Sequence, residues 1–197
     1  PSREHGAPGR PAGHPGGGVS TPRIAPGGVR ELGVPIWTFS RIAGLVTKTE
    51  PPAIFTTLGR GRGLFWGWLH FAGKLMPGGT LPRRQTELVI LRVAALRECA
   101  YEFEHHTLLG RRAGVTAEDL ERVREGSTAA GWSDAERLLM VAAEELVTTK
   151  DLTDETWEQL RAAYEDRGAL EIVLLIGHYD MLATTLMTLR LSPDRRR

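Results

Sequence analysis

The stretch TELVILRVAALRECAYEFEHH, from Thr86 to His106, is the most informative part of this chain of 197 residues. Its first half is almost wholly apolar, with Glu87 and Arg92 as the polar exceptions, which is typical of a helix buried on all sides. Its second half is rich in Cys, Glu and His, the side chains that transfer protons, attack as nucleophiles and bind metals. The sequence therefore places candidate catalytic groups directly after a core helix.

Helical signals continue on both sides of this stretch. Upstream, an apolar stripe at helical spacing runs from Phe65 to Leu75, and Pro77 stops it. Downstream, Thr116 and Ser133 are predicted N-caps, because acidic residues follow each of them in the first turn. No segment alternates convincingly between apolar and polar residues with period two. The predicted fold class is therefore all-α.

The end of the chain predicts two more helices. Thr153 or Asp154 is expected to cap a helix that carries Trp157, and Gly168 is expected to separate it from a last apolar helix. That apolar stretch, Leu170 to Leu191, is interrupted by several polar residues and is interpreted as a buried helix rather than a membrane span. It contains His178, which is interpreted as a core histidine with satisfied hydrogen bonds rather than a pocket residue.

The two ends of the chain differ in composition from its middle. Residues 1–30 hold eight Gly and six Pro and no aromatic residue, so they cannot bury enough apolar surface to offset the entropy of ordering. We therefore predict a disordered tail over residues 1–32, a helical domain over 33–192, and a basic tail over 193–197.

The overall composition limits the classes of partner. The formal net charge is only +1, which gives no electrostatic reason to expect nucleic acid or an anionic membrane as a partner. The single cysteine, Cys99, cannot form a disulfide within one chain, which fits a reducing cytoplasm better than a secreted protein. We predict a cytoplasmic protein that binds a small molecule.

Cys99, Glu102 and His106 follow each other at spacings of three and four, which places them on one face if residues 99–113 are helical. Several interpretations compete. A Glu and a His at this spacing are common on solvated faces, and a lone buried Cys is usually a small hydrophobe. Glu102 and His105 also have the Glu-x-x-His spacing of di-iron bundles, but a second such motif is missing, so no metal site is predicted.

Glu87 favours a functional interpretation, because a carboxylate inside an apolar helix needs a partner or a working role. The spacing of four residues resembles the motif of the alkyl hydroperoxidase D and carboxymuconolactone decarboxylase superfamily. Eleven residues separate Glu87 from Cys99, two separate Cys99 from Glu102, and three separate Glu102 from His106. The blocks LPRRQTELVILRVAAL, YEFEHH, GRRAGVTAEDLERV, GWSDAERLLMVAAEEL, DLTDETWEQL and EIVLLIGHYDML, between about residues 34 and 192, are similar to its decarboxylase-like branch.

The resemblance implies a bundle of about seven to nine helices that forms a dimer, trimer or hexamer. In the peroxidase branch of the superfamily the motif has a second Cys where Glu102 stands here, and that Cys attacks the peroxide. Glu87 and His106 occupy its proton-relay positions and Cys99 its resolving position. A carboxylate cannot be oxidised to a sulfenic acid, so the two-thiol cycle cannot run within this chain.

The decarboxylase branch, which needs no cofactor, therefore gives the preferred hypothesis. His106 is expected to act as general acid and base, with Glu102 sharing its proton and Glu87 orienting the imidazole. Tyr101 is a candidate pocket residue, and Arg92 is expected either to pair with Glu87 or to bind a substrate carboxylate. The alternatives are a peroxidase that uses Cys99 and a helical oligomer that binds a small molecule without catalysis.

Overall fold

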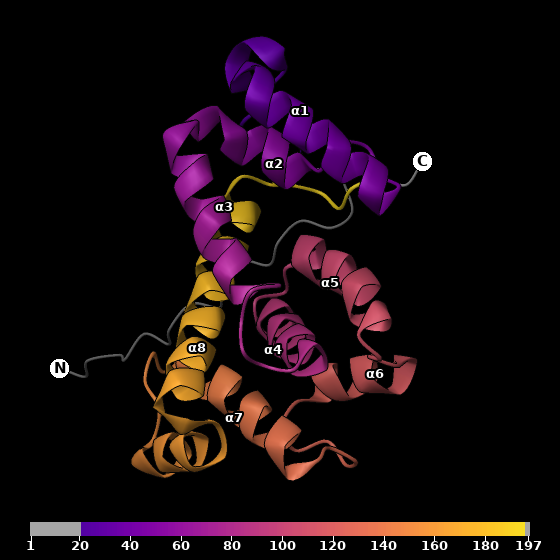
Figure 1. Cartoon of the computed structure of the whole chain (residues 1–197). Helices are drawn as coiled ribbons and strands as arrows, with labels where there is room; N and C mark the ends of the chain where they lie inside the picture. Colours follow the sequence, from indigo (N-terminus) through magenta and orange to yellow (C-terminus); the bar gives the residue numbers. More distant parts are fainter. Residues whose placement is uncertain (1–20, 196–197) are drawn as a thin grey trace, which may run out of the picture.

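The computed structural model describes residues 21–195, and this part of the chain contains eight α-helices and no β-strand (Figure 1). The all-α prediction and the expected number of helices are confirmed. The predicted tail lies mostly outside the described residues. The helices, in chain order, are α1 (Val29–Thr47), α2 (Ala53–Leu58), α3 (Gly63–Leu75), α4 (Arg83–Leu96), α5 (Ala100–Arg112), α6 (Ala117–Glu125), α7 (Asp134–Thr148) and α8 (Asp154–Thr188), with a short 3-10 turn, η1 (Gly59–Gly61), after α2.

The apolar helix α4 forms the centre of the domain. It contacts α5, α6, α7 and α8, and every residue from Thr86 to Ala94 is buried. This environment explains the lack of a polar face in its sequence, since a helix surrounded by other helices is apolar all round. The first three helices form a separate layer with a small core of Leu32, Ile36 and Phe65, and α3 connects this layer to α8 (Figure 1).

The predicted helix starts are confirmed by their capping contacts. The hydroxyl oxygens of Thr116 and Ser133 accept hydrogen bonds from the backbone N–H groups of Asp119 and Glu136, and both helices begin with a capping box. Thr153 caps α8 in the same manner. These local bonds satisfy N–H groups that have no partner within the helix, which fixes where the chain turns.

The break in α8 lies at Glu165 (φ 56°, ψ 176°) and not at Gly168, where the sequence predicted it. Gly168 is small for another reason. A Cβ atom built on it would lie 2.7 Å from Cβ of Tyr164, so the close approach of this side chain requires a glycine. The prediction that Gly168 separates two helices is wrong, and its role is in packing.

Ordered structure also extends into both predicted tails. The first helix begins at Val29, four residues before the predicted start of the domain at Gly33, which itself forms a kink (φ 74°) inside the helix. Leu32 is buried, so this end of the helix has a place in the small core. At the other end, Asp194 accepts hydrogen bonds from the backbone N–H of Ala53 and the hydroxyl of Tyr101. These contacts hold the C-terminal segment against α2 and α5.

Helix α8 has the length and apolar composition to cross a membrane, the only such helix in the described residues. Its buried side chains nevertheless pack against α4 and α7 in the main core. Helix α8 is therefore a core helix of this domain.

Candidate active site

The candidate site begins at the contact between α4 and α5. Glu87 on α4 is fully buried, and its Oε2 atom lies 2.7 Å from Nδ1 of His106 on α5. His106 itself is only 3% exposed. The predicted convergence of these two residues is therefore present, and each supplies the partner that a buried polar group needs.

Two further charged groups extend this pair in opposite directions. Nε2 of His106 lies 3.3 Å from Oε2 of Glu102, which is one helical turn away on α5 and also buried. On the other side, Oε1 of Glu87 lies 2.6 Å from Nη2 of Arg83, although the two groups are not aligned as a hydrogen bond. We treat this last contact as an ion pair. The result is a row of four groups in the order Arg83, Glu87, His106, Glu102.

The two carboxylates determine the protonation of His106. Burial alone lowers the pKa of an imidazole, but Glu102 and Glu87 stabilise the charged form and raise the pKa of His106 to about 9. The side chain is therefore an imidazolium at neutral pH. The neighbouring His105 lacks such partners, so burial, helped by the charge of His106, lowers its pKa to about 4.

A cavity of about 350 Å³ lies beside the row, between α2, α3, α5 and α8. Glu102 and His106 line it, whereas Glu87 lies behind His106 and does not. Most of the remaining wall is apolar and aromatic, with Phe39, Phe55, Trp68, Met76 and Leu182 among its residues. The row of charges thus ends at an apolar pocket of a size suited to a small ligand.

Tyr101 and Cys99 are placed differently from each other. The ring of Tyr101 lines the cavity, but its hydroxyl donates to Asp194 and accepts from the backbone N–H of Ile54. Cys99 is buried and lines a separate, more open cleft of about 440 Å³ together with Glu98, Phe103 and other residues. Burial raises the pKa of the Cys99 thiol. Although this cleft is larger, it lacks Glu102 and His106, so we place the candidate site in the smaller cavity.

Arg92 has a different role from those that the sequence suggested. Its guanidinium contacts Glu144 on α7 at 2.9 to 3.0 Å and donates hydrogen bonds to the backbone carbonyls of Val123 and Arg124. It thereby connects α4 to α6 and α7. The expected pairing with Glu87 is wrong, because Arg83 occupies that position, and Arg92 is not among the residues that line the cavity.

Three residues of the site were not singled out as functional from the sequence. Arg83 precedes Glu87 by four residues, a spacing that could have indicated the ion pair. Tyr179 on α8 lies with its ring edge to face against His106, at 5.1 Å between ring centroids. His178 is buried as predicted, but neither of its ring nitrogens has a hydrogen-bond partner within the described residues. The prediction that its hydrogen bonds are satisfied is wrong.

Within residues 21–195, no group of three or more His, Cys, Asp and Glu side chains has the arrangement of metal ligands. Among the described residues, the fold therefore brings no further metal ligands to Glu102 and His105. Glu102 instead faces His106.

Several known proteins are similar to this chain. Residues 62–145 match the model of the carboxymuconolactone decarboxylase family. An uncharacterized peroxidase-related protein from Silicibacter sp. TM1040 has a TM-score of 0.75 at 15% identity, covering 89% of this chain and 95% of that chain. An uncharacterized peroxidase-related protein with an alkylhydroperoxidase AhpD core, from Ralstonia eutropha JMP134, has a TM-score of 0.76 at 18% identity, covering 87% of this chain and 92% of that chain.

The debrominase Bmp8, whose variant structure contains 2,3,4-tribromopyrrole, has a TM-score of 0.71 at 15% identity, covering 87% of this chain and 91% of that chain. A search of curated proteins gave no match. At these identities the solved structures establish the fold alone, which is that of an alkyl hydroperoxidase D-like helical protein. The family match over residues 62–145 and this fold both support the resemblance to the superfamily of carboxymuconolactone decarboxylases and alkyl hydroperoxidase D-like proteins.

Proposed function

We propose that this chain is a cofactor-free enzyme that transfers a proton on a small organic molecule, with Glu102 as the base. The observation that carries the proposal is the buried row from Glu87 through His106 to Glu102, which ends at an apolar cavity. Glu102 lines this cavity, so its carboxylate faces a bound substrate and can act as a general base.

The geometry supports a division of roles within the row. Both ring nitrogens of His106 face carboxylates, so we assign the direct proton transfer to Glu102 instead of His106. The imidazolium of His106 then balances the charge of Glu102 and holds its carboxylate in place from the side of Nε2. Glu87 orients the ring from behind, and Arg83 balances the second oxygen of Glu87.

One proton step accounts for the reactions that the site would support. Glu102 takes a proton from the carbon beside a carbonyl group, and the electron pair of the C–H bond forms an enolate. Return of the proton at another position gives an isomer. If the substrate is instead a β-keto acid, Glu102 takes the proton of its carboxyl group. The bond between that carboxylate and the α-carbon then breaks, CO2 leaves, and the electron pair forms the enolate, which protonated Glu102 protonates at carbon. Isomerisation and decarboxylation therefore need the same residues.

The peroxidase alternative has less support. A peroxidatic cysteine needs a thiolate within reach of the substrate, whereas Cys99 is buried, has a raised pKa and lines another cleft. The alternative of a binding protein without catalysis would use the same cavity, so only a measurement of turnover separates it from an enzyme.

The assembly and the cellular location are also proposals. Large apolar side chains are exposed along α1, including Val34, Trp37, Ile42 and Leu45, and such a surface supports a homo-oligomer, as a dimer, trimer or hexamer. The single free cysteine supports a cytoplasmic location.

Exchange of hydrogen for deuterium tests the proton transfer directly. The protein is incubated in D2O with a panel of small ketones, lactones and β-keto acids, and 1H NMR follows loss of the proton beside the carbonyl. We expect exchange or CO2 loss with at least one class, and a rate that falls by a factor of about 10² to 10⁴ in Glu102→Gln. Cys99→Ser is the control and is expected to keep the rate.

Three outcomes would contradict the proposal. If Glu102→Gln retains the full rate, the base is another group. Turnover of an organic hydroperoxide that disappears in Cys99→Ser would indicate the peroxidase. Binding of panel members without any turnover would indicate a binding protein.

A further inference from the structure

The cavity has a second polar region, formed by His178 of α8 and Trp68 of α3. Both residues line the cavity together with Glu102. Their rings lie nearly parallel, with 6.3 Å between centroids and 17° between planes. His178 is 4% exposed, and Trp68 is partly buried. The two side chains therefore form one continuous part of the wall.

The polar atoms of this pair have no partner. Nδ1 and Nε2 of His178 and Nε1 of Trp68 are all buried, and none of them forms a hydrogen bond with a described residue. Buried polar groups are almost always paired, because an unpaired group loses its hydration without compensation. Three unpaired nitrogens on one cavity wall are therefore a strong indication that a ligand supplies their partner.

The chemistry of the two side chains specifies what that partner is. The indole N–H of Trp68 can only donate a hydrogen bond. Burial lowers the pKa of His178, so its imidazole is neutral and has one donor and one acceptor nitrogen. The wall thus offers two donors, one from Trp68 and one from His178, together with one acceptor nitrogen of His178, and it brings no positive charge with them.

The charge of the cavity distinguishes between two kinds of acceptor. Among the described residues that line it there is no Lys or Arg, and the imidazolium of His106 is already flanked by Glu87 and Glu102. A carboxylate bound here would lie near Glu102 without a cation to balance it, at a high desolvation cost. A neutral carbonyl oxygen accepts the same hydrogen bonds without this cost.

We propose that His178 and Trp68 bind the carbonyl oxygen of a neutral cyclic ketone or lactone, and so determine the substrate class of this site. The proposal rests on the proposed function, in which Glu102 removes the proton beside that carbonyl. The aromatic wall and the cavity volume of about 350 Å³ fit a flat molecule of one or two rings. During proton removal the carbonyl oxygen gains negative charge, so the two donors would stabilise it most in the enolate.

The test compares ligands that differ only in the acceptor. Ligand-observed NMR measures the binding of 2-tetralone and cyclohexanone, of their methylene analogues in which CH2 replaces the carbonyl oxygen, and of the matching carboxylates. We expect the ketones to bind about tenfold more tightly than the methylene analogues, the effect of one or two good hydrogen bonds. We expect the carboxylates to bind more weakly than the ketones.

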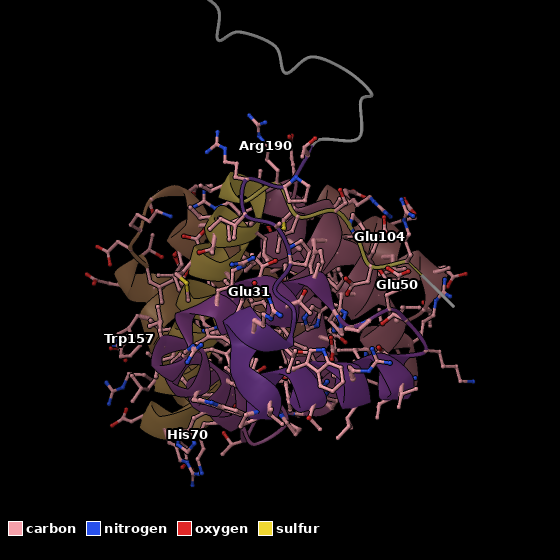
Figure 2. The ribbon with its side chains drawn as sticks, turned by 90° about the horizontal axis from the view of Figure 1, so that it is seen from above. Glu31, Glu50, His70, Glu104, Trp157 and Arg190 are labelled. Carbon is pink, nitrogen blue, oxygen red and sulfur yellow. The ribbon has the colours of Figure 1, made fainter. Side chains whose placement is uncertain are left out.

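Variants assign the preference to the two residues. His178→Phe and Trp68→Phe keep an aromatic ring and remove the nitrogens, so each is expected to reduce the preference for ketones without loss of binding by the methylene analogues. His70→Phe is the matched control, because His70 lies on the same helix as Trp68 but is exposed at the edge of the molecule (Figure 2). It should keep the preference.

The outcomes separate this inference from the proposed function. Ketones that bind no better than their methylene analogues, a preference for carboxylates, or a preference unchanged in both His178→Phe and Trp68→Phe would overturn it. The ketone preference is measured by binding alone, so it is also examined in Glu102→Gln. A preference that persists there while wild-type protein shows no deuterium exchange would support the carbonyl site and reject the catalytic role.

Discussion

Glu87 of α4 and His106 of α5 are joined by a contact of 2.7 Å between two side chains that are almost completely excluded from solvent. This contact joins the central helix of the core to the helix that carries the site. It also leaves the imidazole charged at neutral pH, because a second carboxylate, Glu102, faces the other nitrogen. The stability of the fold and the proposed chemistry therefore both depend on the proton that keeps His106 charged.

The charge of His106 predicts how stability changes with pH. The pKa of His106 is about 9 in the folded protein against an ordinary value of 6.5, so the folded state holds its proton more tightly. This contribution is fully present below about pH 6.5 and is lost as the pH rises to about 9. A pKa difference of one corresponds to about 1.4 kcal/mol, so the full contribution is slightly more than about 3 kcal/mol, and we expect roughly 2 to 3 kcal/mol of it to be lost between pH 6.5 and 9.

Urea unfolding at pH 6, 7, 8 and 9 measures this loss. His106→Gln, which cannot be protonated, is the comparison and should show little dependence on pH over the same range. A wild-type free energy of unfolding that stays constant from pH 6.5 to 9, or an equal slope in His106→Gln, would contradict the assignment.

Glu87 is expected to act as a positioning residue. Glu87→Gln keeps the size of the side chain and removes its charge, so the pKa of His106 should fall and the ring should lose its fixed orientation. We expect kcat for deuterium exchange to decrease about tenfold to a hundredfold with little change in KM. NMR titration of His106 gives the readout that a purely structural role would not change.

Glu144→Gln is the matched control for Glu87→Gln, since Glu144 pairs with Arg92 and does not line the cavity. It should leave the pKa of His106 and the exchange rate unaltered. An unchanged His106 titration in Glu87→Gln would show that the contact does not control the imidazole.

Helical spacing alone placed Glu102 and His106 on one face, and the structure brings them together. The contact of Glu87 with His106 was expected from the resemblance to the superfamily motif, because burial alone left the partner of Glu87 open. Helical spacing was wrong about Cys99, which was expected on the same face. Cys99 is the N-cap of α5 and has extended backbone angles (φ −85°, ψ 92°), so helical spacing does not apply to it. A shift of the helix start by one residue moved this side chain to a different cleft.

Other parts of the site depend on contacts between distant segments, which one sequence does not reveal. Trp68 and His178 meet only because α3 crosses α8, and Asp194 reaches Tyr101 only because the C-terminal segment folds back. Arg92 illustrates the same limit. A buried arginine near a buried glutamate suggests a pair, but the partner is Glu144, 52 residues away.

Arg92 is expected to contribute to stability and not to substrate binding. Arg92→Ala removes a buried guanidinium that contacts Glu144 and two backbone carbonyls, so we expect it to destabilise the protein by about 3 kcal/mol. Chemical denaturation measures the loss, and KM in the exchange reaction should stay unchanged. If the free energy of unfolding falls by less than about 1 kcal/mol, or if KM rises in protein that is still folded, Arg92 would be a substrate-binding residue and not a structural one.

Cys99 is expected to behave as a buried packing residue. Because burial raises the pKa of its thiol and leaves only 2% of the residue exposed, iodoacetamide at pH 7.5 should label native protein slowly and urea-unfolded protein completely. Cys99→Ser should lower the free energy of unfolding by about 1 kcal/mol, because a hydroxyl replaces a small apolar group in the core. Mass spectrometry of the labelled protein gives the rate, and a rate in native protein that matches the unfolded state would mean that Cys99 is accessible. Rapid labelling together with peroxide turnover would then favour the cysteine-based reaction, since a reactive thiolate is what that chemistry needs.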